Sequence, residues 1–372
     1  MRVLFTTLPL VGHLFPVVPL AWAMQCAGDE VVVATPADQF AGRITGAGLS
    51  AVVIRDVPIA DYARASVITG SGTTLEQDLA VSARGWAALA APSADEMTRL
   101  VRDFRPDVVI SEPAEFAGRL AAARAGVPWV EQSWGLPFPD GFRGAAQDEL
   151  TRRGLPLLPP PDAIIHPSPR ELWPAGTPDG LPMRFVPYNG PVRHEKWLSR
   201  GPGGRRAFVT FGSLLVAHGS GQGEVFAKLL EELSAAGFEM IVGMDPAQAH
   251  LLGPLPPGVL HLGWVPLGYA LKECDLAIHH GGSGTSMSSA VSGVPQVILP
   301  SATDQFCTSA AMEAYGAAIR FMPEQVTPTA VRDAANDVLT EPAYRAAATA
   351  LAREIASLAA PGTVAENLWM LI

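Results

Sequence analysis

The sequence is poor in cysteine, in clustered basic residues and in long apolar runs, and each shortage argues against a class of protein. Its three cysteines, Cys26, Cys274 and Cys307, are too few and too scattered for a disulfide framework or a zinc site, which favours a reducing cytoplasm. A formal net charge of −10 argues against a nucleic-acid partner. No stretch reaches the roughly 18 consecutive apolar residues of a membrane span. We therefore expect a cytoplasmic protein that binds neither nucleic acid nor membrane.

Apolar residues are plentiful and are arranged in short alternating segments. Of the 372 residues, 48% are hydrophobic and 17% charged, which is enough apolar material for two domains with buried sheets. Short β-rich runs at 3–5 and 31–34 are separated by Ala-rich helical patterns, and the alternation restarts at 207–211. Alternating strands and helices predict parallel sheets covered on both faces. The sequence therefore predicts an α/β fold with two Rossmann-like domains.

Proline and glycine mark the expected boundaries between these domains, at 187–191 and 201–204. We predict an N-terminal domain at 1–190, a linker at 191–206, a C-terminal domain at 207–355, and a last helix at 356–372 that returns to the first domain. Because such sheets place ligands at the carboxyl ends of their strands, the site is expected in a deep cleft between two facing domains.

A short apolar strand at 274–278 runs into paired histidines and a glycine-rich turn that opens a helix. Backbone N–H groups at a helix start are unpaired and carry the positive end of the helix dipole, so they form a seat for a phosphate. Taken alone, glycines after a strand more often serve a tight turn. The residues concerned are His279, His280, Gly281, Gly282, Ser283, Gly284 and Thr285.

The surroundings of this turn resemble the donor half of the GT-B glycosyltransferases that use nucleotide sugars, particularly the bacterial enzymes that decorate polyketides and other natural products. The resemblance is carried by Gly263-Trp264-Val265-Pro266 upstream, and by 293–300 followed by Asp304-Gln305 downstream. It implies that Trp264 stacks on the pyrimidine and that Asp304 and Gln305 bind sugar hydroxyls. It further implies that the diphosphate is contacted by Ser213 and His279, while His280 has no direct role.

The same resemblance supplies a catalytic pair in the first half. Its Gly-His-x-x-Pro segment matches Gly12 to Pro16, so that His13 is the general base that deprotonates the acceptor. Glu112 stands where the family usually has an aspartate that supports the histidine, and Glu115 is the fallback partner. A second interpretation is that Glu112 only caps the helix expected at 114–125.

Large apolar side chains in the first half indicate an apolar acceptor such as a polyketide aglycone, although most of them could equally belong to the core. We expect acceptor contacts from Trp86, Trp134 and Phe138. No Asp-x-Asp triplet occurs, which fits a diphosphate stabilised by a helix dipole and an imidazole instead of a metal ion. The predicted enzyme is thus a metal-independent transferase that moves a deoxysugar from a TDP- or UDP-sugar with inversion, in antibiotic biosynthesis.

Alternatives stay open at this point. An epimerase of the same GT-B architecture would keep the donor motif without an acceptor pocket, and attack through a ring carbon would give C- instead of O-glycosylation. A catalytically silent partner of a transferase is a third reading, and a nicotinamide dehydrogenase a fourth, although no Gly-x-Gly-x-x-Gly follows the first strand. The expected partners are a nucleotide sugar and a small apolar aglycone, with a homodimer compatible with the sequence.

Overall fold

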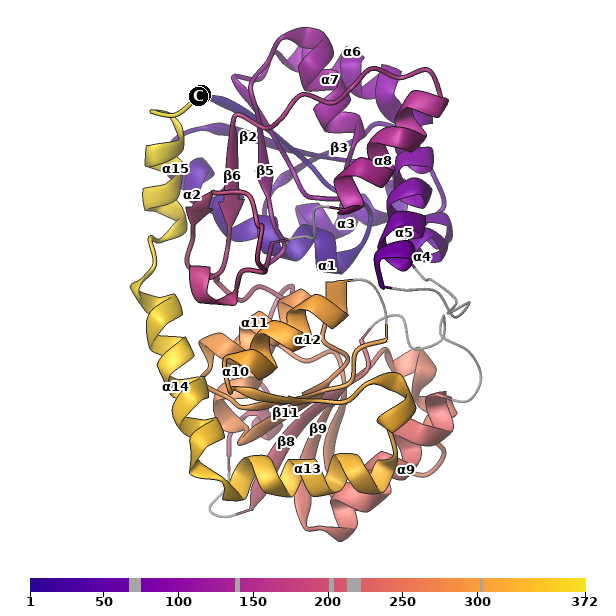
Figure 1. Ribbon diagram of the computed structural model, residues 1–372, viewed down its shortest axis with the longest axis vertical. Coiled ribbons are helices and arrows are strands. Elements are labelled where there is room, and N and C mark those ends of the chain that lie inside the picture. Colours follow the sequence, from indigo (N-terminus) through magenta and orange to yellow (C-terminus); the bar gives the residue numbers. More distant parts are fainter. Residues whose placement is uncertain (67–74, 138–140, 201–203, 213–221, 302–303) are drawn as a thin grey trace. The chain divides into compact units, whose positions relative to one another are not determined.

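The protein folds into two units, each built around one parallel sheet. The computed structural model describes residues 1–66, 75–137, 141–200, 204–212, 222–301 and 304–372. The first unit comprises Met1–Phe185 together with Ser357–Ile372, and the second comprises Val186–Ala356. Both sheets contain only parallel strands, which confirms the predicted α/β fold with two Rossmann-like units (Figure 1).

The sheet of the first unit has the order β3-β2-β1-β4-β5-β6-β7. Its central strands β4 and β5 are buried along their whole length and β1 from Val3 onward, as expected for a parallel sheet covered on both faces. The strands are β1 Arg2–Thr6, β2 Glu30–Thr35, β3 Ser50–Val53, β4 Val108–Ser111, β5 Trp129–Gln132, β6 Ala163–His166 and β7 Leu181–Pro182.

Helices cover both faces of this first sheet. One side is packed by α5 to α8, whose apolar residues share a core with Leu4 and Val109 of the sheet. The C-terminal helix α15 lies beside α2 (Figure 1). The helices are α1 Val11–Leu14, α2 Val18–Cys26, α3 Asp38–Thr45, α4 Ile59–Ser66, α5 Leu75–Ala90, α6 Ala94–Phe104, α7 Ala117–Ala125, α8 Gly141–Arg152 and α15 Pro361–Leu368.

The sheet of the second unit repeats the same winding, with the order β10-β9-β8-β11-β12-β13. Alternate residues of β8 enter different cores, since Val209 packs with α9 and α13 while Phe208 packs with α10. The strands are β8 Arg205–Thr210, β9 Phe238–Gly243, β10 Val259–Gly263, β11 Leu276–His279, β12 Gln296–Ile298 and β13 Ala318–Arg320.

In the second unit α9 and α13 cover one face of the sheet, and α10, α11 and α12 lie on the other (Figure 1). The helices are α9 Gln222–Ala235, α10 Leu267–Ala270, α11 Ser283–Val291, α12 Asp304–Ala314, α13 Pro328–Thr340 and α14 Pro342–Ser357. In the described parts of the chain no helix is long and apolar enough to cross a membrane.

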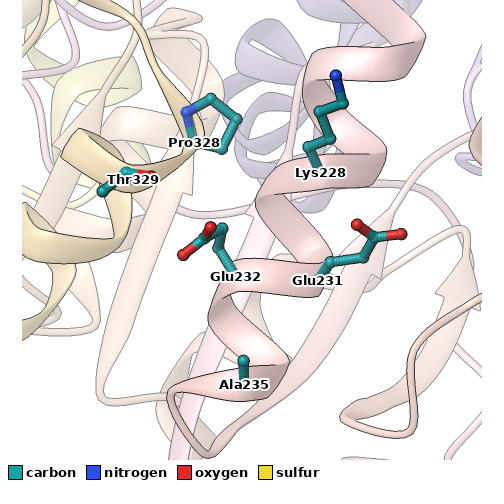
Figure 2. Close-up of a pocket in the computed structure, with 6 residues that line it drawn as sticks. All are labelled: Lys228, Glu231, Glu232, Ala235, Pro328 and Thr329. Carbon is teal, nitrogen blue, oxygen red and sulfur yellow. The ribbon is translucent and has the colours of Figure 1, made fainter.

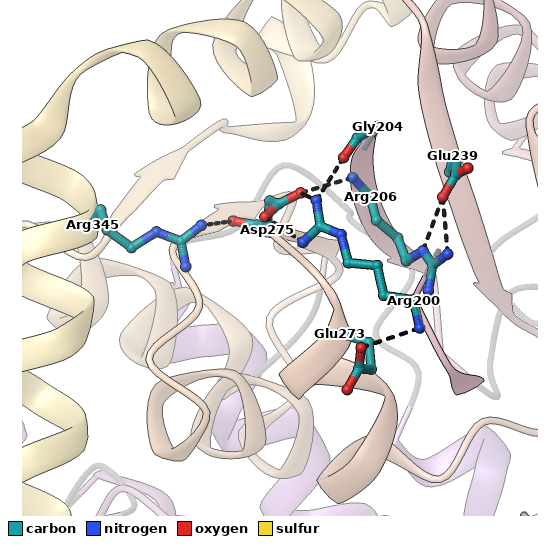
Figure 3. Close-up of polar contacts among 7 residues, drawn as sticks. All are labelled: Arg200, Gly204, Arg206, Glu239, Glu273, Asp275 and Arg345. Atoms are coloured by element: carbon teal, nitrogen blue, oxygen red, sulfur yellow. Dashed lines mark hydrogen bonds and ion pairs between the residues drawn. The ribbon is translucent and has the colours of Figure 1, made fainter. Parts of the chain in front are cut away.

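The segment expected as a linker is tied to the amino ends of the second sheet (Figure 3). Arg200 binds both carboxylate oxygens of Asp275, at 2.8 and 2.7 Å, and the Arg206 backbone N–H donates to the same carboxylate at 2.9 Å. Arg345 of α14 donates to the Asp275 carbonyl at 2.7 Å. These contacts fix the start of β11 and do not involve its carboxyl end.

Strand order defines a switch point in each sheet, where the chain turns from winding in one direction to winding in the other. In the first sheet it lies between β1 and β4, and in the second between β8 and β11. Loops that follow these strands diverge to opposite faces of the sheet and leave a crevice in which ligands of such folds bind. The predicted catalytic residues follow β1 and β4, and the predicted phosphate seat follows β11.

Candidate functional site

His13 and Glu112 meet at the switch point of the first sheet. His13 lies in α1 directly after β1, and Glu112 is the first residue after β4; the two strands pair through Thr6 and Ser111. Nδ1 of His13 is 2.9 Å from Oε1 of Glu112. A carboxylate can only accept, so Nδ1 carries a proton, and in the neutral ring Nε2 is then the nitrogen with the lone pair. A histidine held in this tautomer has the form that a general base requires.

From the residues that the structure describes, the Glu112 carboxylate accepts four hydrogen bonds, two on each oxygen. Besides His13, Oε1 accepts the Leu8 N–H at 3.2 Å, and Oε2 accepts the Ala114 N–H at 2.7 Å and the Trp134 Nε1–H at 3.1 Å. Burial is the largest influence on this group and opposes ionisation. His13 and the backbone N–H groups together outweigh it and hold the pKa of the Glu112 carboxyl below its ordinary value. Glu112 is therefore a fixed, ionised carboxylate.

Glu115 has a separate task. Its oxygens accept the N–H groups of Ala117 and Gly118, at 2.9 and 2.8 Å, where α7 begins. Burial raises the pKa of the Glu115 carboxyl, although the hydrogen bonds from Thr6 and Gly118 act in the other direction. The second interpretation, in which Glu112 only caps this helix, therefore applies to Glu115 instead. Glu112 binds His13 and also the backbone N–H of Ala114.

Two tryptophans enclose the imidazole of His13. The Trp134 ring lies 4.1 Å from it, tilted by 55°, and the Trp86 ring meets it edge-on at 5.4 Å. Their exposed fractions are only 5% and 2%, and both belong to the core under α5 and α8. Phe138, the third predicted acceptor contact, lies outside the described residues. The two indoles therefore contact the imidazole itself.

A buried ion pair supports Glu112 from beneath. The Arg119 side chain of α7 donates through Nη2 to the Glu112 carbonyl at 2.7 Å, and its Nη1 lies 3.2 Å from Oε2 of Glu131 on β5. Arg143 of α8 binds the other oxygen of Glu131. Burial lowers the pKa of Arg119, and Glu131 opposes that effect. Nothing in the sequence pairs these residues, since the contacts depend on the neighbouring positions of α7, β5 and α8.

The predicted phosphate seat forms at the start of α11. Gly282 is the N-cap and provides no side-chain hydrogen bond to the helix. Ser283 follows it, and its buried hydroxyl has no partner among the residues that the structure describes. Gly281 has φ +86°, a conformation that glycine adopts without strain, and its Cβ would also crowd Ile298 and Gln305. The helix start thus has N–H groups and one hydroxyl that could bind an anion.

The two histidines before this helix differ in their surroundings. His279 is fully buried: Nδ1 accepts the Gly281 N–H at 3.0 Å, and the Nε2–H donates to Oε1 of Gln296 at 2.8 Å. Burial lowers the pKa of His279 to about 4, although Gln296 opposes this, so the ring is neutral. Both of its nitrogens are occupied within the protein, which leaves none for a diphosphate.

His280 stands beside the helix start instead. A Cβ on Gly282 would lie 2.5 Å from its Nε2, and one on Gly212 would lie 2.7 Å from the same atom. This nitrogen is therefore lodged between the loops that follow β11 and β8, at the second switch point. The sequence analysis assigned His280 no role, because the sequence does not show in which direction each of the two imidazole rings points. Ser213, which follows Gly212, lies outside the described residues.

The remaining predicted donor residues occupy diverse environments. Trp264 is 44% exposed, and its Nε1–H donates to the Asn189 carbonyl at 2.7 Å. Val265 is part of the core with α10, while Gln305 accepts the Ser301 N–H at 2.9 Å at the beginning of α12, where Asp304 is the first residue. In the described ranges no three His, Cys, Asp or Glu side chains gather as they would around a metal ion.

A shallow hollow elsewhere in the second unit carries no comparable chemistry. It is formed by the second half of α9 and the start of α13 (Figure 2). That half of α9 runs back toward the amino ends of the strands, away from the switch point, and Glu232 is engaged by Arg332. Its lining residues are Lys228, Glu231, Glu232, Ala235, Pro328 and Thr329.

Comparison with known proteins places the chain in a family. Two models of the erythromycin biosynthesis protein CIII-like family match the chain, the N-terminal domain over residues 22–212 and the C-terminal domain over 227–371. The L-demethylnoviosyl transferase of Streptomyces niveus is 38% identical over 99% of this chain and 97% of its own. The elloramycin glycosyltransferase ElmGT of Streptomyces olivaceus is 34% identical over 99% and 97%.

Solved structures give the same answer. The spinosyn rhamnosyltransferase SpnG complexed with thymidine diphosphate has a TM-score of 0.87 and 30% identity over 99% of this chain and 100% of its own. Glycosyltransferase SsfS6 of Streptomyces sp. SF2575, also complexed with thymidine diphosphate, has a TM-score of 0.82 and 30% identity over 100% and 99%. The fold and the comparisons define a glycosyltransferase of the GT-B class, which confirms the predicted resemblance. Within that class, the chain belongs to the erythromycin biosynthesis protein CIII-like family.

Proposed function

We propose that this enzyme transfers a deoxysugar from a thymidine or uridine diphosphate sugar to the hydroxyl of an apolar aglycone, with inversion at the anomeric carbon. The observation that carries the proposal is the His13–Glu112 pair, whose 2.9 Å hydrogen bond leaves Nε2 of the imidazole as an acceptor. A neutral imidazole fixed in this tautomer by an ionised carboxylate is the arrangement that general base catalysis needs.

The reaction then follows as a single displacement. Nε2 of His13 takes the proton of the acceptor hydroxyl. At the same time the hydroxyl oxygen forms a bond to the anomeric carbon, and the bond between that carbon and the diphosphate breaks. Glu112 stabilises the imidazolium that results. Because attack occurs opposite the leaving group and no covalent enzyme intermediate forms, the configuration inverts. The imidazolium of His13 later loses its proton to solvent. The nucleoside diphosphate departs with the electron pair of the bond that joined it to the anomeric carbon.

The leaving diphosphate is stabilised by the start of α11. The N–H groups of Gly282, Ser283 and Gly284 and the Ser283 hydroxyl supply hydrogen bonds, and the helix dipole supplies a fixed positive potential. We assign the imidazole contact to His280 and not to His279, because both nitrogens of His279 are occupied by Gly281 and Gln296. This seat supplies donors without a metal ion, so we propose metal-independent transfer.

We propose the other contacts to the donor on the resemblance to the family. The indole of Trp264 is exposed enough to stack on a pyrimidine beside Val265. Ser213 and Thr285 add hydroxyls near the diphosphate, and Asp304 and Gln305 bind sugar hydroxyls from the start of α12. Two structural relatives were solved with thymidine diphosphate, which favours TDP over UDP as the nucleotide.

An apolar aglycone is favoured by the aromatic surroundings of His13 and by the relatives. SpnG was also solved with a spinosyn aglycone, and ElmGT is named for elloramycin. We propose that the acceptor hydroxyl reaches His13 beside Trp86 and Trp134, with Phe138 as a further contact.

The test is mass spectrometry of products after incubation of TDP- and UDP-sugars with aromatic and macrolide aglycones, in the presence of a chelator. The expected product is an aglycone heavier by one sugar, made by the wild type and at least a hundredfold more slowly by His13→Ala. A changed nucleotide sugar without any aglycone would indicate an epimerase. Transfer that appears only when a divalent ion is added would contradict the metal-independent mechanism.

A further inference from the structure

Trp134 contacts both members of the catalytic pair at once. Its Nε1–H donates to Oε2 of Glu112 at 3.1 Å, and its ring lies 4.1 Å from the His13 imidazole. Among the described residues the Glu112 carboxylate has four donors, of which two are backbone N–H groups and one is His13, so Trp134 is the only other described side chain that holds it. Trp134 comes from the loop after β5, the strand beside β4 in the sheet.

Trp86 offers a comparison within the same molecule. It is an equally buried indole, and its ring meets His13 edge-on at 5.4 Å. Its Nε1–H has no partner among the described residues, and it makes no hydrogen bond to Glu112 there. The two tryptophans thus share burial and contact with the imidazole, and they differ in the hydrogen bond to the carboxylate.

We propose that Trp134 is a positioning residue that acts on His13 through Glu112, beyond any contact it makes with the acceptor; this inference rests on the proposed function of the pair. The carboxylate can turn about its last bond, and of the described donors only the Ala114 N–H would hold Oε2 if the indole were absent. With Trp134 in place, Oε2 is held from two directions and Oε1 is directed at Nδ1 of His13. Donors to a charged carboxylate are stronger than those between neutral groups.

The geometry also suits the charge that forms during reaction. When His13 accepts a proton, the centre of the imidazolium lies 4.1 Å from that of the indole, and an indole is the aromatic side chain that attracts a cation most strongly. The same residue thus fixes the carboxylate before proton transfer and faces the cation after it. Neither effect requires Trp134 to touch the aglycone.

A double-mutant cycle separates action through Glu112 from direct contact with the acceptor. Trp134→Phe and, as the matched control, Trp86→Phe are each prepared in the wild type and in Glu112→Gln. In the wild type we expect Trp134→Phe to lower kcat about tenfold, with KM for the nucleotide sugar within twofold. In Glu112→Gln the charged acceptor is already lost, so the same change should lower kcat less than about threefold. Trp86→Phe should have the same effect in both backgrounds.

Equal losses from Trp134→Phe in both backgrounds would overturn the proposal, because a residue that acts on the acceptor or the fold has no reason to depend on Glu112. An unchanged kcat for Trp134→Phe would overturn it as well. Should Trp134→Phe not fold, 3-benzothienylalanine at position 134 replaces the N–H by sulfur at nearly the same shape, and the same cycle applies. If His13→Ala keeps full activity, the assignment of His13 as the base is wrong. If the wild type transfers no sugar, the proposed function itself is wrong.

Discussion

The Nε2–H of His279 donates to Oε1 of Gln296 at 2.8 Å, and both side chains are buried. The two residues lie on the neighbouring strands β11 and β12, which pair in register through His279 and Ile298 and through Ala277 and Gln296. This bond turns the first histidine of the motif into the sheet. The adjacent His280 lies beside the N-cap of α11, so two identical neighbours in the sequence have different surroundings.

Substitution of each histidine should therefore have a different result. His280→Ala should weaken binding of thymidine diphosphate roughly tenfold or more, because a hydrogen bond to a charged group contributes about 1.5–3 kcal/mol, while stability stays near that of the wild type. His279→Ala should lower the free energy of unfolding by roughly 1–3 kcal/mol, since it leaves the Gln296 Oε1 and the Gly281 N–H without partners. Calorimetric titration and urea unfolding measure the two quantities. The reverse pattern would return the diphosphate contact to His279.

The depressed pKa of His279 predicts a loss of stability in mild acid. Its pKa of about 4 in the folded protein lies below the ordinary value of 6.5, so the unfolded chain binds a proton first as the pH falls. Stability contributed by the neutral ring is complete above about pH 6.5 and is lost progressively toward pH 4, by about 2 kcal/mol between pH 7 and pH 5. Buried His166, with a pKa also near 4, adds a loss of the same sign.

The His279 contribution is isolated by His279→Gln, whose amide can still donate to Gln296. The difference in unfolding free energy between pH 7 and pH 5 should shrink in this variant. Exposed His250→Gln is the control and should keep the wild-type difference. An undiminished difference in His279→Gln would show that the ring titrates normally in the folded state.

The catalytic pair predicts a separation of turnover from nucleotide affinity. His13→Ala should lower kcat by about 10²–10⁴-fold, because proton abstraction in the transition state is lost. Glu112→Gln should lower it less, since the amide keeps a hydrogen-bond acceptor but not the charge that stabilises imidazolium. Nucleotide affinity should stay near wild type in both, because the phosphate seat belongs to the other unit. Parallel loss of nucleotide binding would place His13 in the donor site or in the fold.

The sequence predicted those parts of the molecule that depend on local pattern. Alternating strands and helices indicated both sheets, and glycines after an apolar strand indicated the start of α11. It did not predict which of His279 and His280 faces inward, because that depends on a partner 17 residues away on β12. The sequence also did not predict the hydrogen bond from Trp134 to Glu112, because this bond depends on β5 lying beside β4 in the sheet. Trp134 was therefore considered only as an acceptor contact.

A tightly packed layer beneath the pair makes Gly118 a sensitive position. A Cβ there would lie 2.3 Å from Oγ1 of Thr6 and 2.7 Å from Oε2 of Glu115, so Gly118→Ala should cost roughly 1–3 kcal/mol through overpacking. A Cβ at Gly144 on α8 would have no atom within 4 Å, so Gly144→Ala should raise the free energy of unfolding by about 0.5–1 kcal/mol. Urea unfolding compares the two. A neutral Gly118→Ala would mean that Thr6 and Glu115 can move apart without loss.

The buried ion pair below Glu112 predicts a stability effect that an exposed pair does not share. Arg119 and Glu131 are almost completely buried, whereas Arg170 and Asp179 form an exposed pair at 2.6 Å. Arg119→Met should lower the free energy of unfolding by about 3–5 kcal/mol, because it leaves a buried carboxylate with one partner fewer. Arg170→Met should change stability within experimental error.

Arg119→Met should also lower kcat at temperatures where the variant is folded. The substitution removes the 2.7 Å hydrogen bond to the Glu112 carbonyl and thereby loosens the backbone that carries the catalytic carboxylate. Arg119→Lys keeps the charge but cannot serve Glu131 and the carbonyl with one planar group, so it should fall between the wild type and Arg119→Met. If Arg119→Met is as stable as the wild type and as active, desolvation of the two charges cancels their attraction, and Glu112 is held in place by its own four hydrogen bonds.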